Sequence, residues 1–225
     1  MYRTVERMVE QGEDGPGRAV PEERHSDAAP QTPCFTAGTL IATRRGDVAV
    51  EDLAVGDCIL TRDNGYRQIL WIGAREFSAA ALQEHPDLKP VRIAKGALGP
   101  MTPASDLLVS PQHRMLLSGG LADGFAGDRE VLVSAVDLIG LGHAAAAEVP
   151  GVIYYHILFA DHEVVLANGA WSESFNPALA ALGGLHQMQR QELLRIFPEL
   201  ASRLGAHVYP LARAVYQAVS ESVAA

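Results

Sequence analysis

The chain has 225 residues, 48% of them hydrophobic and 20% charged, with a formal net charge of −9. This composition suits one globular domain that can bury a core without disulfides, and two cysteines, Cys34 and Cys58, are too few for a disulfide framework. The acidic charge argues against binding to a nucleic-acid backbone or to an anionic membrane, so we expect neither as a partner.

Residues 1–33 are polar, charged and rich in proline and glycine. Such a segment buries too little apolar surface to offset the entropy of ordering, so we expect a flexible leader. It lacks the apolar stretch of a signal peptide, and no window of the chain reaches the ~18 apolar residues of a membrane helix. We therefore expect a cytoplasmic protein, or one exported by a route that needs no N-terminal signal peptide.

Residues 34–175 contain many short apolar runs separated by turn signals. Asp63-Asn64-Gly65 is a strong hairpin signal, and Asn168-Gly169 is another. The β-branched runs at 39–43, 154–159 and 163–166 have the length of strands rather than helices. Because no long helical periodicity separates these runs, the region predicts an all-β domain rather than βαβ units.

Residues 176–225 change to a helical period. The first apolar stripe consists of Leu185, Met188, Leu193, Leu194 and Phe197. The second stripe consists of Leu211, Ala212, Val215 and Val219. We predict a helical C-terminal extension, with two helices that dock on the β domain or on each other.

Cys34 stands at a turn that leads into strand residues, and its thiol can attack the carbonyl of Pro33 through a five-membered ring. A thioester forms while the Cys34 nitrogen leaves as an amine. This chemistry needs a group that protonates the nitrogen and polar groups that hold the peptide. In the segment 110–113, His113 could supply the first function and Ser110 the second. Taken singly, each residue also fits a structural role as a buried cysteine, a core histidine or a turn serine.

Three segments together resemble the Hint family, which includes inteins and the autoprocessing part of Hedgehog proteins. Residues 34–41 match the opening block with its nucleophilic cysteine. Ser110-Pro111-Gln112-His113 matches a Thr-x-x-His block with serine in place of threonine. Residues 161–169 match the closing block, so the resemblance covers residues 34 to about 174. The chain is most similar to bacterial Hint-domain proteins outside the inteins.

The resemblance implies a flat, disc-like all-β fold with pseudo-two-fold symmetry. It implies an N-to-S acyl shift from Cys34 onto Pro33, with the N-terminal segment of the same chain as the substrate. His113 would protonate the leaving nitrogen, and Ser110 would position the scissile peptide.

The resemblance also implies that His162 lies near the same centre. Asp161, next to it in the closing block, is expected with Pro33 at the bound substrate segment. We expect no cofactor and no resident metal ion. The acyl acceptor would be water, a thiol or another small molecule.

The closing block departs from that of inteins in a way that affects the reaction. Inteins end in His-Asn, and that asparagine cyclises to release the C-terminal side, whereas Glu173 and Ser174 occupy the matching positions here. An acidic residue common early in this block falls on Tyr155. We therefore predict cleavage before Cys34 and no splicing.

Three alternatives remain at this stage. The domain could be a non-catalytic Hint-fold scaffold or binding module. Cys34 and His113 could form the dyad of a thiol protease that acts on other proteins. Cys34, His113 and His162 could also hold zinc, as an incidental inhibitory site.

Overall fold

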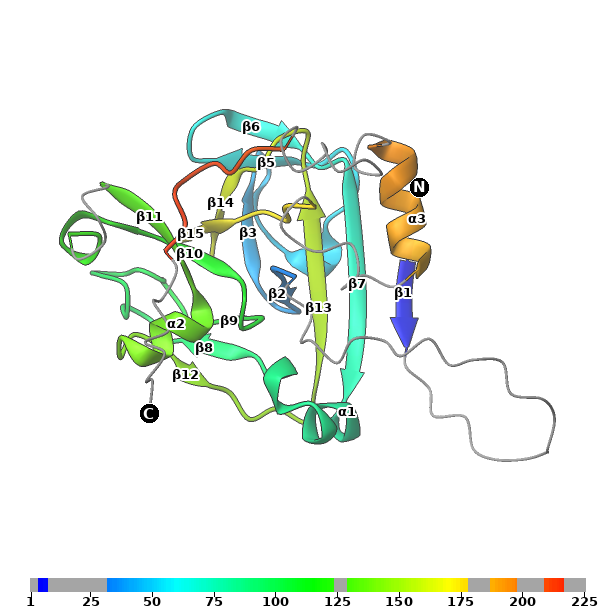
Figure 1. Cartoon of the computed structure of the whole chain (residues 1–225). Coiled ribbons are helices and arrows are strands. Elements are labelled where there is room, and N and C mark those ends of the chain that lie inside the picture. The colour runs from blue at the N-terminus through cyan, green and yellow to red at the C-terminus, as the bar shows by residue number, and fades with distance from the viewer. Residues whose placement is uncertain (1–3, 8–31, 124–128, 178–186, 198–208, 217–225) are drawn as a thin grey trace, which may run out of the picture.

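The structure is a computed structural model that describes residues 4–7, 32–123, 129–177, 187–197 and 209–216 (Figure 1). These residues form two β-sheets with a few short helices, which confirms the predicted all-β class. No helix in the described ranges is long and apolar enough to cross a membrane.

The first sheet has seven strands, in the order β1-β7-β13-β2-β9-β8-β12. Their bounds are β1 Thr4–Arg7, β2 Phe35–Thr36, β7 Trp71–Ser78, β8 Val91–Ile93, β9 Leu107–Val109, β12 Ala145–Ala146 and β13 Gly151–Leu158. Strands β7 and β13 run antiparallel along their full length, from Trp71 opposite Leu158 to Ser78 opposite Gly151. They form the long central pair in Figure 1.

The second sheet has eight strands in the order β11-β10-β15-β14-β3-β5-β6, with β4 added beside β3. Their bounds are β3 Leu40–Thr43, β4 Gly46–Ala49, β5 Cys58–Thr61, β6 Gly65–Gln68, β10 Arg114–Ser118, β11 Glu130–Ser134, β14 Val164–Ala167 and β15 Ala170–Glu173. Hairpin β14–β15 turns at Asn168 and Gly169, both with positive φ, as this dipeptide predicts.

The main apolar core takes buried side chains from both sheets. Its largest members include Phe35, Ile41, Ile59, Ile93, Leu107, Met115 and Phe159. Short helices connect several of the strands. Their bounds are α1 Ala79–Glu84, α2 Ala135–Gly140, η1 Val50–Asp52, η2 Pro86–Leu88 and η3 Gly119–Leu121. The Ser78 and Ser134 side chains accept hydrogen bonds at the first turns of α1 and α2, as capping residues do.

The N-terminal leader differs from expectation at its six described residues, because Thr32 and Pro33 are buried and residues 4–7 form a strand. Thr4–Arg7 form β1, which pairs in parallel with Thr4 opposite Gly73 and Arg7 opposite Glu76. An open edge of β7 offers unpaired main-chain groups, and a passing segment of either polarity can satisfy them. Residues 1–3 and 8–31, where a flexible leader was also predicted, lie outside the described residues.

The helical tail is confirmed in its first part and wrong in its second. Helix α3 (Gln187–Ile196) buries Leu193 in a cluster that includes Trp71 and Phe175. The predicted second helix is extended instead: the main-chain N–H of Tyr216 donates to the carbonyl of Leu132. Val219, the last residue of the predicted stripe, lies outside the described residues.

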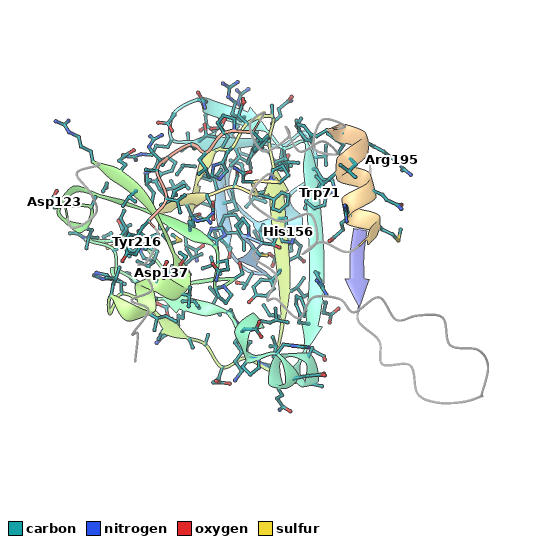
Figure 2. All side chains as sticks on the ribbon, viewed as in Figure 1. Trp71, Asp123, Asp137, His156, Arg195 and Tyr216 are labelled. Carbon is teal, nitrogen blue, oxygen red and sulfur yellow. The ribbon has the colours of Figure 1, made fainter. Side chains whose placement is uncertain are left out.

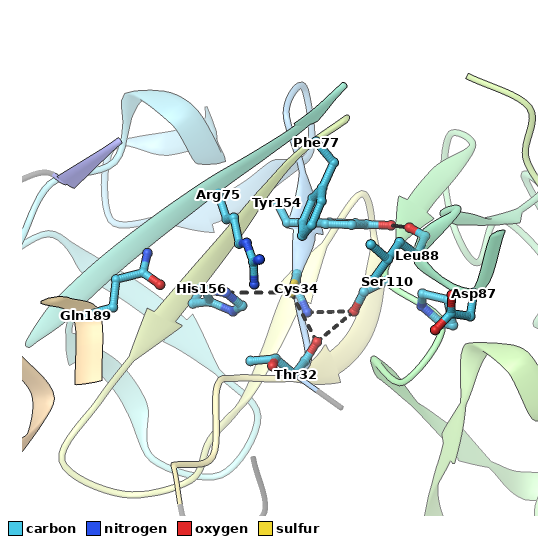
Figure 3. A pocket seen from close by; sticks show the side chains of 11 residues that line it. Thr32, Cys34, Arg75, Phe77, Asp87, Leu88, Ser110, Tyr154, His156 and Gln189 are labelled. Atoms are coloured by element: carbon cyan, nitrogen blue, oxygen red, sulfur yellow. Dashed lines mark hydrogen bonds between the residues drawn. The ribbon is translucent and has the colours of Figure 1, made fainter. Parts of the chain in front are cut away.

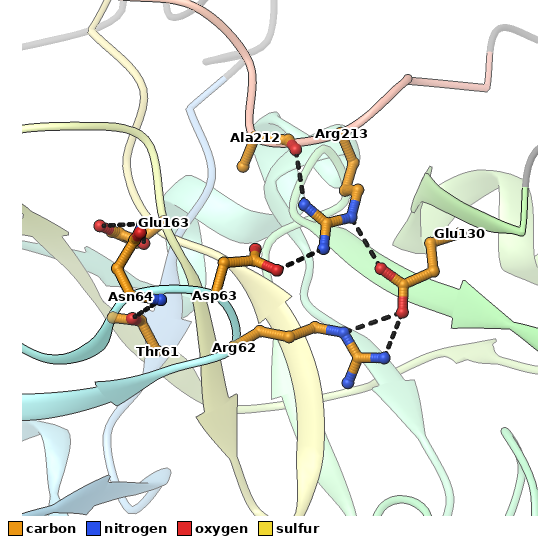
Figure 4. Close-up of polar contacts among 8 residues, drawn as sticks. All are labelled: Thr61, Arg62, Asp63, Asn64, Glu130, Glu163, Ala212 and Arg213. Atoms are coloured by element: carbon orange, nitrogen blue, oxygen red, sulfur yellow. Dashed lines mark hydrogen bonds and ion pairs between the residues drawn. The ribbon is translucent and has the colours of Figure 1, made fainter.

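The extended segment 209–216, which we call the C-terminal strap, lies across the second sheet. Ala212 and Val215 contact the apolar cluster of Leu132 and its neighbours, so tertiary burial overrides the helical spacing. The Arg213 guanidinium binds Glu130 at 2.7 Å and Asp63 at 2.6 Å, and Arg62 binds the other oxygen of Glu130 (Figure 4).

Candidate active site around the Pro33–Cys34 peptide

The central strands of the first sheet bring Cys34 together with residues far from it in the sequence. Cys34 comes directly before β2, where Phe35 lies opposite Val109 of β9 and Tyr155 of β13. Ser110 follows β9, and His156 lies on β13. The sheet register therefore places both side chains beside the Pro33–Cys34 peptide.

Ser110 holds this peptide by hydrogen bonds on both sides of Cys34. The Cys34 amide N–H donates to Ser110 Oγ at 3.0 Å, and the Ser110 hydroxyl donates to the Thr32 carbonyl at 2.9 Å. The Ser110 main-chain N–H donates to the Cys34 carbonyl at 3.0 Å. These are the contacts through which Ser110 would position a scissile peptide.

His156 contacts both the carbonyl and the thiol of the candidate reaction. Its Nδ1 lies 3.0 Å from the Pro33 carbonyl oxygen, and its Nε2 lies 3.7 Å from Cys34 Sγ (Figure 3). A carbonyl oxygen only accepts, so Nδ1 carries the proton and Nε2 of the neutral ring is an acceptor. Burial lowers the pKa of His156 to about 4, although the Pro33 contact acts in the opposite direction. The ring is therefore neutral at pH 7.

The Cys34 thiol is protonated in this resting arrangement. Burial raises its pKa above the ordinary range, while Ser110 and the charge of Arg75 oppose that effect. Its Sγ lies 3.0 Å from the Thr32 carbonyl oxygen, a contact that only the protonated thiol can make as a donor. Attack on Pro33 therefore requires a base, and Nε2 of His156 is the nearest described nitrogen acceptor.

His113 lies next to this site, and its main-chain N–H donates to the Ser110 carbonyl at 3.0 Å, but its ring makes no described hydrogen bond. Its ring packs edge-on against Phe35 with 4.5 Å between centroids, and neither ring nitrogen has a hydrogen-bond partner among the described residues. Burial lowers its pKa to about 4, and the charge of Glu173 opposes this shift. The structure thus brings His113 close through β10 but gives no contact between its imidazole and Cys34.

His162 and Asp161 occupy other surroundings. Nδ1 of His162 accepts the Ala212 main-chain N–H of the strap at 3.0 Å, and its Nε2 lies 3.4 Å from the fully buried carboxylate of Glu173. Asp161 is exposed and lines a surface depression beside β6. Neither side chain has a described contact with Pro33 or Cys34.

The sequence interpretation did not include His156. It noted only that an acidic residue common in inteins falls on Tyr155, the neighbouring position, and neighbouring residues of a strand face opposite sides of the sheet. Tyr155 enters the main core, whereas Tyr154 and His156 face the Cys34 side. The available signal was a single histidine within the apolar run 152–159. The His156 ring stacks on the Trp71 ring with 6.2 Å between centroids, and both residues are labelled in Figure 2.

A pocket opens beside the thiol. It encloses about 390 Å³ including its mouth, and its enclosed part is narrow. The described residues contain no group of three or more metal-ligating side chains, so the zinc alternative gains no support.

Comparison with known proteins agrees with this architecture. A family model described as the Hint domain matches residues 33–179, which is more than half of the chain. The chain therefore belongs to the Hint domain family, as its three blocks indicated. No curated protein matches the sequence.

The solved structures that match this chain include inteins and an intein-like domain. An AceL NrdHF class 3 split intein variant has 15% identity and a TM-score of 0.37, and covers 63% of this chain and 97% of its own. The gp41-1 intein has 14% identity and a TM-score of 0.35, covering 62% and 97%. A bacterial intein-like domain from Clostridium thermocellum has 14% identity and a TM-score of 0.36, covering 63% and 97%.

Proposed function

We propose that this Hint module cleaves its own chain before Cys34, through an N-to-S acyl shift onto Pro33. One observation carries the proposal: the three reacting groups of a single peptide each have a suitable partner. Ser110 holds the amide nitrogen, while His156 reaches the carbonyl oxygen through Nδ1 and the thiol through Nε2.

The first step moves the thiol proton and forms the carbon–sulfur bond. The Cys34 thiol leaves its contact with Thr32 and gives its proton to Nε2 of His156. The sulfur attacks the carbonyl carbon of Pro33, and the negative charge that develops on the oxygen is stabilised by the Nδ1–H of His156. Because the attacking group is held next to the carbonyl, about 7 kcal/mol or more of the barrier is offset by folding.

The second step breaks the Pro33–Cys34 carbon–nitrogen bond. The nitrogen needs one proton to leave as an amine, and we assign its delivery to His113. The ring turns away from Phe35 to do so, which its lack of described hydrogen bonds permits. As the neutral His113 ring gives its N–H proton to the leaving nitrogen, its other ring nitrogen takes up the proton that His156 received from the thiol. Both rings end neutral, and a thioester remains between Pro33 and Cys34.

The thioester is then resolved by water or another acceptor, which gives residues 1–33 and 34–225 as separate products. Splicing is not part of the proposal. Ser174, at the position of the cyclising asparagine, is fully buried, and its hydroxyl oxygen accepts the main-chain N–H of Glu163 at 3.0 Å. Serine has no side-chain amide, so the cyclisation that releases the C-terminal side of an intein has no nucleophile at this position.

The test is mass spectrometry of the purified full chain over hours, with and without dithiothreitol or hydroxylamine. We expect a break between Pro33 and Cys34 that both reagents accelerate. Cys34→Ala abolishes this cleavage, whereas Cys58→Ala, which removes the other thiol, retains it. An intact wild-type chain under every nucleophile refutes autoprocessing.

A second candidate, a non-catalytic scaffold, is favoured by the raised pKa of the buried thiol and its donation to Thr32. It predicts that the wild-type chain stays intact and that Cys34→Ala changes only stability. The alternative of a thiol protease that acts on other proteins gains no support from the structure. The enclosed part of the pocket beside Cys34 is too small for a peptide chain.

A further inference from the structure

The first strand of the molecule belongs to the segment that the proposed cleavage separates from the rest of the chain. Strand β1, Thr4–Arg7, pairs with Gly73–Glu76 of β7. Among the described residues, β7 has β1 on one side and β13 on the other, and β1 is the last strand of the sheet. The edge of β7 is therefore covered by a segment that lies before Cys34. Cleavage cuts the covalent link but does not touch this main-chain pairing.

The edge of β7 also receives helix α3, and the two segments follow one another along the strand (Figure 1). The Gln189 side-chain amide of α3 donates to the Ala74 carbonyl at 3.1 Å, and Ala74 is the residue opposite Val5 of β1. Strand β7 buries most of its side chains. An exposed edge of such a strand pairs readily with other chains, so the fold is more stable when β1 remains on it.

The other end of the leader has an anchor of its own. Thr32 is 2% exposed, and its carbonyl accepts the Ser110 hydroxyl at 2.9 Å. Pro33 is buried as well, and its carbonyl oxygen lies 3.0 Å from Nδ1 of His156. Cleavage of the bond between Pro33 and Cys34 removes none of these groups. The leader is thus held at two separate places, near its first residues and at its last two.

Hydrolysis of the thioester adds opposite charges at the cut. Water supplies the hydroxyl of the new Pro33 carboxyl group and the hydrogen of the Cys34 thiol. The carboxyl group then loses a proton and the Cys34 amine takes one up, as their ordinary pKa values require at pH 7. Carboxylate and ammonium face each other where the peptide bond stood, so each new charge in this buried place has a partner.

We propose that the edge of β7 is a docking site for the leader, and that residues 1–33 stay bound to residues 34–225 after cleavage. The proposal rests on the autoprocessing function. The two anchors, β1 and Thr32–Pro33, belong to one product, and residues 8–31 connect them. A product held at two points dissociates only when both are free at the same time, so it binds more tightly than through either contact alone. Cleavage therefore converts the leader from a covalent segment into a bound partner chain.

The experiment follows the full chain after it has cleaved itself. Denaturing mass spectrometry identifies the two products, and native mass spectrometry shows whether they form one complex. Mixing isotope-labelled and unlabelled cleaved protein then gives the rate at which leaders exchange. We expect one complex in the native spectrum, and an exchange about tenfold faster or more when Val5→Pro and Glu6→Pro are combined, because a main-chain hydrogen bond is lost. Neighbouring N–H groups of a strand point in opposite directions, so one of the two prolines removes a bond to β7. The matched control, Glu13→Pro with Asp14→Pro outside β1, should leave the exchange unchanged.

The outcomes separate failure of this proposal from failure of autoprocessing. Leaders that leave under native conditions, or that exchange equally fast with and without the prolines in β1, overturn the proposal while autoprocessing stands. A chain that never cleaves refutes autoprocessing and, with it, the retained leader. The docking site itself is then decided in the uncleaved full chain with Cys34→Ala. There the two prolines in β1 should accelerate hydrogen exchange about tenfold or more at the amides of Gly73–Glu76 that face β1, and unchanged exchange would refute the docking of β1 on β7.

Discussion

Acidification should destabilise this fold through two buried histidines, His113 and His156. Burial lowers the pKa of each to about 4 in the folded protein. The ordinary value of about 6.5 applies in the unfolded chain. The unfolded chain therefore binds more protons between these two values, so the free energy of unfolding falls as the pH falls from about 6.5 to about 4. The contribution of the two neutral histidines to the free energy of unfolding is fully present above about pH 6.5. Below about pH 4 the loss is complete and does not grow further.

The size of the effect follows from the two pKa values. At pH 5 the unfolded rings are almost fully protonated while the folded rings are mostly neutral. The difference is about 2 kcal/mol for each histidine relative to pH 7, or about 4 kcal/mol for both. This is a large part of the ~5–15 kcal/mol that stabilises a typical domain.

Urea unfolding at pH 7 and pH 5 measures this loss. The Cys34→Ala background prevents cleavage during the experiment. His156→Gln in that background should lose about 2 kcal/mol less between the two pH values than the parent does. His85→Gln, which alters an exposed histidine, should lose as much as the parent. Glu163, whose pKa is raised mainly by burial, acts in the opposite direction, but it is common to all three chains.

Equal losses in the parent and in His156→Gln would refute the reasoning. His156 would then titrate in the folded protein as it does in the unfolded chain, and burial would not lower the pKa of its ring.

Three further predictions concern single contacts. Ser110→Ala leaves the Cys34 N–H without its partner, so urea unfolding should show a loss of about 1–3 kcal/mol, and cleavage measured by mass spectrometry should slow at least tenfold. Gly73→Ala places a Cβ 2.3 Å from Trp71 Cη2, so it should cost about 1–3 kcal/mol or more and change the tryptophan fluorescence. Glu173→Gln removes the buried carboxylate that binds Arg114, so it should cost about 3 kcal/mol in urea unfolding at pH 7.

Each of these has a control or a contradicting outcome. Ser110→Thr restores a hydroxyl and should recover part of the cleavage rate, and an unchanged rate in Ser110→Ala would remove serine from the mechanism. Gly120→Ala meets no atom within 4 Å and should be nearly neutral. An unaltered free energy of unfolding in Glu173→Gln would show that the ion pair contributes nothing to stability.

The sequence predicted the features that depend on neighbouring residues. Asn168-Gly169 forms its hairpin because both positions adopt positive φ, which this dipeptide tolerates. The short β-branched runs form strands, and the spacing around Leu193 forms α3. The same spacing failed at Ala212 and Val215, because burial against Leu132 outweighs a weak helical preference.

The sequence by itself determined the all-β class, the family blocks and the cysteine that precedes β2. The tertiary structure decided which polar groups meet that cysteine. His156 is separated from Cys34 by 122 positions and reaches it through the register of β13 with β2. His162 carries the same side chain, yet it faces Glu173 and the strap. Hydrogen-bond partners depend on strand pairing and on which face of the sheet a residue occupies, and no local pattern in the chain specifies either one.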